Sequence, residues 1–377
     1  MISLFSSTEL SLGDKLRNIN WLLLLFVCLL AGVGFAMLYA AAGGNVNPWL
    51  ARQFPRFVVG VLAMLVIAMV DIRIWLKYAY FFYGLAFLTL LSVEFVGEVG
   101  QGAQRWISIG GIKLQPSEMM KIGVIMAVAR YFQLVKVDEP KLKSLLFPLA
   151  LITAPAVLVL KQPDLGTAGL ILLSGLSVFF AAGVSARYFI VGGILGLIAI
   201  PVGWNFLHTY QQKRVLTFLD PERDPLGSGY HIIQSKIALG SGGITGKGYM
   251  AGSQSQLNFL PEKQTDFIFT MIGEEFGLLG SASLIGLYVV ILMYGYAIAL
   301  RTHNQFGRLM VVGLMTTFFL YFFINMAMVM GLFPVVGIPL PLVSYGGTAM
   351  LAVLISFGLV MNAWVHRDIQ LSRTIDF

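Results

Sequence analysis

Long apolar runs recur along the whole 377-residue chain and are separated by polar segments, most of them short. A helix needs about 20 mostly apolar residues to cross the hydrocarbon core of a bilayer. Only 11% of the residues are charged, less than half of the roughly 25% found in soluble proteins. We therefore expect an all-α polytopic membrane protein that forms a single domain over residues 1–377. About ten transmembrane helices are predicted, at residues 20–41, 57–71, 75–95, 117–134, 144–161, 165–183, 188–206, 275–300, 308–331 and 343–365.

Lysine and arginine residues are scattered through short loops between the apolar runs, which is the pattern of membrane topology. The net charge of +7 is therefore attributed to membrane topology; membrane lipids are expected to surround the protein, and no nucleic-acid partner is expected. The apolar run after Lys15 and Arg17 is longer than the core of a signal peptide, about 7–15 residues, so it is predicted to remain as the first helix. Among the short loops, positive charge is more frequent in those on the same side of the membrane as the N-terminus. Both termini are therefore predicted to be cytoplasmic.

Two outer loops are unusually long, at residues 96–116 and 207–265. The second is predicted to be a large extracytoplasmic loop between helices seven and eight. Loops longer than about 12–15 residues are usually functional or disordered. The loop 207–265 holds Tyr230, Ile232, Leu257 and other apolar residues, so we expect it to pack onto the outer end of the bundle.

Asp266 lies in the stretch FLPEKQTDFIF, at the mouth of an apolar run. Leu278–Leu300 already suffices to span a bilayer at about 1.5 Å per residue, so the preceding residues lie above it or enter as a half-buried helix. On a helix, Asp266 would share a stripe with Thr270, Gly273 and Gly277. A carboxyl group in such a polar groove with apolar walls has a raised pKa and is suited to accept a proton. The alternative is that Asp266 only caps the helix.

Two further outer segments carry charge. In QPSEMMK, Glu118 and Lys121 are three residues apart and share a helix face. They form either a structural ion pair or a pair that lines a cavity, with Lys121 available to an anionic substrate. In KQPDLGTA, Asp164 sits in a tight turn, where it either caps a helix or belongs to a site.

Two glycine- or proline-rich outer segments are also candidates for the site. The stretch GSGGITGKG resembles a phosphate loop but fails its pattern, because Ser241 stands where a glycine is needed and Gly248 where a hydroxyl is needed. Its backbone amides and Lys247 remain candidates for contacting a diphosphate. The prolines of residues 334–350 predict irregular backbone, which at membrane depth is tolerated where it packs in protein or lines a cavity; the alternative is a plain turn.

Residues suited to acid and base chemistry therefore collect at the outer boundary. They are Arg52, Arg105, Glu118, Lys121, Asp164, Lys247 and Asp266. The four histidines are scattered without metal-ligand spacing, and no arrangement for covalent catalysis is recognisable. The pattern suits a lipid-linked anionic substrate with a polar head outside the membrane, and equally an ion-coupled transporter.

Four stretches together resemble the SEDS family (shape, elongation, division and sporulation): GAQRWISIGGIKLQPSE, QPDLGTA, the segment from GYHIIQSKIALG to TDFIF, and PVVGIPLPLVSYGG. The resemblance covers residues 15–368, and the VVG triplet favours the elongation branch. It implies a multi-pass protein of the bacterial cytoplasmic (inner) membrane, a peptidoglycan glycosyltransferase that polymerises lipid II on the extracytoplasmic side for cell elongation and rod shape. An α-linked donor gives a β-1,4 product by inversion, and undecaprenyl diphosphate leaves.

The resemblance also implies roles for single residues. Asp266 matches the essential aspartate of the family and is expected to be the general base. The diphosphate candidates are Arg52, Arg105, Lys121 and Lys247. Glu118 would hold Lys121 in place. Asp164 would order the cavity or help bind a divalent cation, Mg or Mn. No other cofactor is expected.

Partners and rival functions follow from the same comparison. A class B penicillin-binding protein (a transpeptidase) is the expected partner, with other proteins of the elongation complex. Its contact is expected on helices eight and nine, near residues 284–300 and 325–333. The rival functions are a lipid II flippase, which needs a charged path to the inner leaflet, and a non-catalytic scaffold of the elongation complex.

Overall fold

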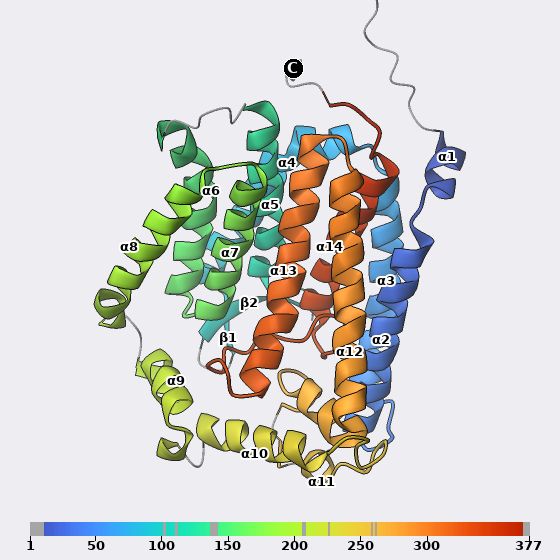
Figure 1. Ribbon diagram of the computed structural model, residues 1–377, viewed down its shortest axis with the longest axis vertical. Coiled ribbons are helices and arrows are strands. Elements are labelled where there is room, and N and C mark those ends of the chain that lie inside the picture. Colours follow the sequence, from blue (N-terminus) through green and yellow to red (C-terminus); the bar gives the residue numbers. More distant parts are fainter. Residues whose placement is uncertain are drawn as a thin grey trace, which may run out of the picture.

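The structure is a computed structural model that describes residues 11–100, 103–109, 112–135, 142–205, 209–224, 227–257, 259–260 and 262–371. It is a bundle of long helices that run roughly along one axis (Figure 1). The helices that match the predicted spans are α2 (Trp21–Ala41), α3 (Trp49–Met69), α4 (Ile72–Val96), α5 (Pro116–Leu134), α6 (Leu142–Lys161), α7 (Leu165–Ala181), α8 (Ala186–Trp204), α12 (Ile268–Arg301), α13 (Gln305–Val329) and α14 (Gly347–Val365). The predicted all-α polytopic fold is confirmed.

Within the described part of the chain, eight of these helices are long and apolar enough to cross a membrane. Helix α7 is apolar but shorter. Helix α5 carries Glu118, Lys121 and Arg130, yet it is buried by other helices along nearly its whole length. Its polar groups therefore meet protein instead of lipid, which explains how a helix of modest hydropathy occupies the middle of the bundle.

Two helices begin seven or eight residues earlier than predicted. Helix α3 starts at Trp49 instead of residue 57, because its first turns contain Arg52, Gln53 and Arg56, which a hydropathy criterion excludes. Helix α12 starts at Ile268 instead of residue 275. It is interrupted at Gly277, whose φ of 65° and ψ of −156° are not helical, so a short helical segment precedes the long span.

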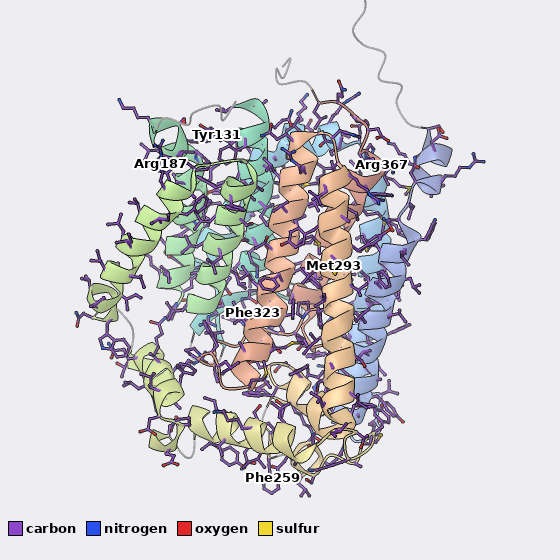
Figure 2. The ribbon with its side chains drawn as sticks, viewed as in Figure 1. Tyr131, Arg187, Phe259, Met293, Phe323 and Arg367 are labelled. Carbon is purple, nitrogen blue, oxygen red and sulfur yellow. The ribbon has the colours of Figure 1, made fainter. Side chains whose placement is uncertain are left out.

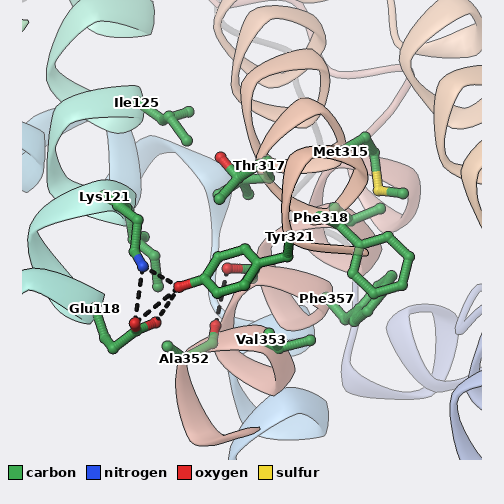
Figure 3. A pocket seen from close by; sticks show the side chains of 14 residues that line it. Glu118, Lys121, Ile125, Met315, Thr317, Phe318, Tyr321, Ala352, Val353 and Phe357 are labelled. Atoms are coloured by element: carbon green, nitrogen blue, oxygen red, sulfur yellow. Dashed lines mark hydrogen bonds and ion pairs between the residues drawn. The ribbon is translucent and has the colours of Figure 1, made fainter. Parts of the chain in front are cut away.

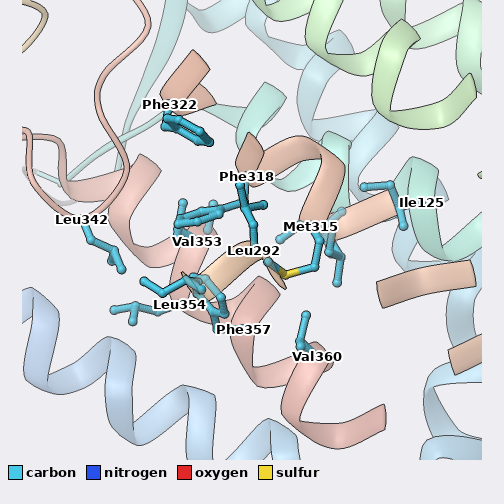
Figure 4. Close-up of a cluster of buried hydrophobic side chains, with 14 of the residues drawn as sticks. Ile125, Leu292, Met315, Phe318, Phe322, Leu342, Val353, Leu354, Phe357 and Val360 are labelled. Carbon is cyan, nitrogen blue, oxygen red and sulfur yellow. The ribbon is translucent and has the colours of Figure 1, made fainter. Parts of the chain in front are cut away.

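Aromatic and aliphatic side chains from α12, α13 and α14 fill the centre of the bundle (Figure 4). Tyr288 is fully buried and stacks on Phe322 with ring centroids 5.0 Å apart. Phe318 packs edge-on against Phe357 at 5.1 Å. These contacts hold α12, α13 and α14 together directly beneath the outer loops. Helix α8, in contrast, has no buried residue and stands at the edge of the bundle (Figure 1).

The large loop folds into α9 (Thr209–Leu219), the short 3-10 helix η1 (Pro221–Arg223), α10 (Ser228–Ser241) and α11 (Ser253–Gln256). Residues 206–208, 225–226, 258 and 261 of this region lie outside the described residues. As predicted, the loop packs on the bundle: Ile232 is buried, and Ser235 Oγ donates a hydrogen bond to Val329 O at 2.7 Å. The other long loop forms strands that were not predicted, β1 (Glu98–Gly100), β2 (Ala103–Ile109) and β3 (Ile112–Leu114), in an antiparallel sheet of order β1-β2-β3.

The two ends of the described chain lie at the same end of the bundle, and α9, α10 and α11 lie at the opposite end (Figure 1). Arg187 and Arg367 lie at the end with the termini, whereas Phe259 lies at the other (Figure 2). This arrangement requires an even number of crossings, as the predicted topology does.

Candidate active site

Asp266 lies in a turn, residues 262–267, that leads into α12. Its backbone carbonyl accepts a hydrogen bond of 2.9 Å from Asn325 Nδ2, which also donates to Ile338 O at 2.7 Å. Asn325 on α13 is completely buried. One amide side chain therefore joins the turn to the proline-rich loop, which we define as residues 332–346.

The proline-rich loop makes three further contacts with the turn. Ser344 Oγ donates to Thr265 O at 2.6 Å, and Tyr345 N donates to Gln264 O at 2.8 Å. Gly337 has a φ of +74°, and a Cβ atom there would lie 3.3 Å from Asp266 Oδ2. The carboxylate thus lies directly against backbone that only glycine leaves open.

The surroundings of Asp266 favour proton transfer. Burial, and to a smaller extent the Glu262 carboxylate, raise the pKa of Asp266, whereas the Arg214 guanidinium lowers it; together they bring the pKa to about 6. A carboxyl group with a pKa near 6 is largely ionised at neutral pH and is still basic enough to accept a proton. The predicted rise in the pKa of Asp266 is confirmed.

The predicted helical stripe below Asp266 was wrong, and so was the alternative of a helix cap. The helix begins after Asp266, and its N-cap residue is Phe267, without a side-chain hydrogen bond. Thr270 Oγ1 hydrogen-bonds to Ser235 Oγ at 2.8 Å, and Leu239 covers Gly273. Helix α10 therefore fills the groove that the stripe of small residues would otherwise form.

Glu118 and Lys121 form a buried ion pair of 2.8 Å, with side-chain exposures of 5% and 3%. The hydroxyl of Tyr321 on α13 donates to both Glu118 oxygens, at 2.8 and 2.6 Å, and Lys121 Nζ donates to the same hydroxyl (Figure 3). The three side chains close one end of a cavity of about 30 Å³ between α5, α13 and α14, enough for a few water molecules. The pair is structural, as one reading held, and it also lines a cavity. Lys121 Nζ is engaged with Glu118 and Tyr321, so its availability to an anionic substrate stays a prediction.

Tyr321 also lines a second, smaller cavity of about 10 Å³, whose other walls include Pro339 and Pro341. The buried ion pair and the proline-rich loop consequently meet at one side chain. Tyr321 was not singled out from the sequence. A polar residue within the apolar run of α13 was the available signal.

Arg105 and Asp164 are joined in the outer part of the bundle. Their side chains form an ion pair of 3.5 Å, and Asp164 Oδ1 accepts from Thr167 N at 3.0 Å, which caps α7. Arg105 also donates to the carbonyls of Gln162 and Pro163. The capping interpretation of Asp164 is confirmed. Arg105 stabilises the turn of residues 162–164 through these hydrogen bonds and the ion pair. This turn adjoins the proline-rich loop, since a Cβ at Gly166 would meet Val336 and Ile338.

Lys247 and Arg52 do not join the other candidates. Lys247 Nζ lies 2.8 Å from Glu274 Oε1 and 2.9 Å from Ser253 Oγ. Glu274 is fully buried and also accepts from the amides of Gln254 and Ser255. Lys247 is thus engaged with the chain's own carboxylate. Arg52 is exposed, and no described residue pairs with it.

The cation that α3 does place beside the loop is Arg56, one helical turn after Arg52. Its guanidinium lies 5.9 Å from the ring centroid of Tyr345, and a Cβ at Gly347 would lie 2.8 Å from its Nη1. The neighbouring Gln53 Nε2 donates to Ser344 O at 3.2 Å. Arg52 and Arg56 lie in the same polar segment, so the sequence does not show which of them faces the site, and Arg52 was the residue predicted. Which arginine faces the proline-rich loop depends on the rotation of α3 about its axis, which only the structure shows.

Comparison with known proteins identifies the family. The FtsW/RodA/SpoVE model, described as a cell cycle protein, matches residues 18–369. The chain belongs to the FtsW/RodA/SpoVE family. The peptidoglycan glycosyltransferase MrdB of Escherichia coli (strain K12) is 45% identical over 363 residues, which cover 96% of this chain and 97% of MrdB. The resemblance to the elongation branch is thereby confirmed.

Solved structures of the FtsW/RodA/SpoVE family agree with this fold. A chain in a peptidoglycan synthase complex, described as coordinating polymerization and crosslinking, superimposes with a TM-score of 0.80 at 33% identity and covers 93% of this chain and 98% of its own length. A crystal structure of a mutant of the Thermus thermophilus rod shape determining protein RodA gives a TM-score of 0.71 at 28% identity, over 93% and 99% of the two chains.

Two remaining expectations for this family member concern a cation and the partner surface. Among the described residues, no group of three or more His, Cys, Asp or Glu side chains is placed to hold a metal ion, and Asp164 already serves Arg105 and Thr167. Of the Met-rich segment offered as a partner contact, Met326 and Met328 are buried in this chain's own core, whereas Met330, Leu332 and Phe333 are exposed.

Proposed function

We propose that the protein is a peptidoglycan glycosyltransferase that polymerises lipid II, with Asp266 as the general base of the transfer. The glycosyltransferase activity follows from the 45% identity to MrdB over nearly the full length of both chains. The assignment of the base is supported by one observation above the others. Asp266 is a half-buried carboxylate with a pKa of about 6. Hydrogen bonds from Asn325 on α13 and from Ser344 and Tyr345 of the proline-rich loop hold the backbone of its turn, at the carbonyls of residues 264–266.

In the proposed step, the Asp266 carboxylate accepts the proton of a sugar hydroxyl on the acceptor. The hydroxyl oxygen forms a bond to the anomeric carbon of the donor, and the bond from that carbon to the diphosphate oxygen breaks. The electron pair leaves with undecaprenyl diphosphate, so the configuration inverts in one displacement. A positioned base lowers the barrier by taking the proton as the new bond forms, an effect typically worth about 10²- to 10⁴-fold. No covalent enzyme intermediate is needed.

The leaving diphosphate needs positive charge. Arg56 is the half-buried cation beside the proline-rich loop, with Arg52 one turn away toward solvent. Lys121 is held by Glu118 and Tyr321, and Arg105 by Asp164. We assign Arg56, assisted by Arg52, to the diphosphate, and we assign Lys121, Arg105 and Asp164 to holding the walls of the site. Lys247 supports the outer loop.

We further propose that the active site faces the extracytoplasmic side, that both termini are cytoplasmic, and that a class B penicillin-binding protein is the partner. The site and the folded outer loop lie at the end of the bundle opposite the termini (Figure 1), and positive loop charge favours a cytoplasmic location for the termini. The partner proposal is supported by the structural similarity to a chain of a peptidoglycan synthase complex.

A lipid II flippase is the rival function. It would need polar groups that continue from the site toward the inner leaflet. Below the ion pair, the larger cavity is lined by Thr317, Ser356 and otherwise apolar side chains such as Met315 and Val360. Apart from Lys121 at one end, which Glu118 and Tyr321 already engage, the described lining offers a diphosphate no cation, which favours a polymerase.

The test uses purified protein with and without its transpeptidase partner, incubated with labelled lipid II. Glycan strands are separated on a gel, and transbilayer movement is measured in parallel in reconstituted vesicles. Long strands that disappear with Asp266→Asn support the proposal. Scrambling of lipid II without strand formation would establish the flippase, and strands of wild-type length from Asp266→Asn would remove Asp266 from the chemistry.

A further inference from the structure

Arg214 connects an outer helix to the segment that carries Asp266. It lies on α9 and donates a hydrogen bond from Nη1 to Val335 O at 2.8 Å. Val335 is two residues before Gly337, against which the Asp266 carboxylate lies. Since neighbouring Cα atoms are about 3.8 Å apart, the guanidinium and the carboxylate both contact a stretch of backbone only a few ångströms long.

Helix α9 belongs to the large loop, and Arg214 links it to the segment beside Asp266. Helix α9 packs on η1 and α10 within the large loop, and Gln212 Nε2 on the same helix donates to Trp204 O at the end of α8. Through Arg214, α9 hydrogen-bonds to the proline-rich loop. Arg214 is half-buried, so its charge is screened by solvent less than that of an exposed arginine.

We propose that Arg214 is a positioning residue that keeps the Asp266 carboxylate ionised and in place for proton transfer. This inference rests on the proposed role of Asp266 as the general base. The two charged groups that act on Asp266 oppose each other: Glu262, in the same turn, favours the protonated form, and Arg214, from α9, favours the ionised form. His231 on α10 faces the same region, because its ring lies 6.0 Å from that of Phe267.

The geometry argues against a diphosphate role for Arg214. In an inverting displacement, the acceptor attacks from the face opposite the leaving group. The base must therefore lie on the acceptor side, and the cations that receive the diphosphate on the other side. Arg214 and Asp266 both lie against the backbone of residues 335–337, so Arg214 lies on the acceptor side together with the base. Its positive charge there can stabilise the ionised base before the reaction.

The sign of the effect follows directly. Asp266 acts as a base only when deprotonated, so kcat/KM falls as the pH drops through the pKa of Asp266, about 6. Removing the positive charge of Arg214 favours the protonated form. The acid limb of the pH profile should then move to higher pH, by about half a pH unit or more, because the charge that is removed is partly buried. Activity at low pH falls about threefold or more, and the profiles converge at high pH.

The experiment measures kcat/KM for lipid II polymerisation from about pH 5 to about pH 8.5, with the full chain and its transpeptidase partner. Each profile is scaled to its own plateau, which removes differences in folded fraction. Arg214→Gln should shift the acid limb, whereas Arg214→Lys, which keeps the charge, should retain the wild-type midpoint. Lys213→Gln is the matched control, because Lys213 is the neighbouring cation, is largely exposed and pairs with Asp224 at 3.3 Å.

An Arg214→Gln profile that only scales down, with an unchanged midpoint, would overturn the inference and leave Arg214 a structural role. An equal shift in Lys213→Gln would overturn it too, because the effect would then be general. If Arg214→Gln is inactive, Arg214→Lys decides: a wild-type midpoint supports the inference and a shifted one contradicts it. Failure of the base assignment itself is recognised separately, by an active Asp266→Asn.

Discussion

Replacing Lys121 by methionine tests how the buried ion pair of α5 contributes to the fold. The change keeps the aliphatic volume of the lysine stem but leaves the Glu118 carboxylate, 5% exposed, without its cation at 2.8 Å. Removing one partner of a buried pair costs about 3–5 kcal/mol. Because the Tyr321 hydroxyl still donates to both carboxylate oxygens, we expect the lower end of that range, about 3 kcal/mol.

The second variant, Glu118→Gln with Lys121→Met, separates a lost interaction from a stranded charge. Glutamine is neutral and retains an oxygen for the Tyr321 hydroxyl, so the double variant should recover to within about 1 kcal/mol of the wild type. Stability is measured as the free energy of unfolding in detergent. Lys161→Met is the control, since Lys161 is exposed at the end of α6 and should change the stability by less than about 0.5 kcal/mol.

Two results would refute this reasoning. A single variant as stable as the wild type would mean that Glu118 is not a stranded charge after the loss of Lys121. If the free energy of unfolding falls in the double variant by the sum of the losses in Lys121→Met and Glu118→Gln alone, the two residues are not coupled. If the double variant is stable but binds lipid II weakly, Lys121 also contacts the substrate, and its assignment to the wall of the site is wrong.

Three other substitutions give shorter tests. Asp164→Ala should lower the free energy of unfolding by about 1–2 kcal/mol through loss of the α7 cap, and Asp164→Asn by clearly less; equal losses would contradict a capping role. Lys247→Ala leaves the buried Glu274 without its cation and should cost about 1–3 kcal/mol with an unchanged KM for lipid II, whereas a large rise in KM would restore Lys247 to the substrate site. Gly337→Ala forces a side chain into a φ of +74° and against Asp266 Oδ2, so it should cost about 1–2 kcal/mol and slow polymerisation; a wild-type rate would contradict the close contact.

Most of the fold was predictable because a bilayer imposes a length and an apolarity on every crossing segment. The errors fell where that constraint ends. The first turns of α3 contain Arg52 and Arg56, and the helix continues past the apolar limit into the polar boundary. Residues 262–267 form a turn, so Asp266 lies before α12 instead of on it, and α10 occupies the side of α12 that carries Thr270.

The site was predictable only in part, since its geometry depends on contacts between distant segments. Asp266 was found through the family motif and the cost of a carboxylate at a membrane helix. Arg214 and Asn325 were missed: an arginine in a polar loop carries no signal, whereas an asparagine in the apolar run of α13 does. Lys247 was misassigned because a glycine-rich stretch with a lysine has the same pattern whether it binds a phosphate or the chain's own Glu274.

The central claim is that Asp266 takes the proton of the acceptor hydroxyl, and the most direct measurement compares Asp266→Asn with the wild type for both lipid II binding and polymerisation rate. Asparagine keeps the size and the backbone contacts but cannot accept the proton. The account predicts an unchanged dissociation constant and a rate lower by about 10²- to 10⁴-fold at neutral pH. A near wild-type rate, or a loss explained entirely by weaker binding, would contradict it.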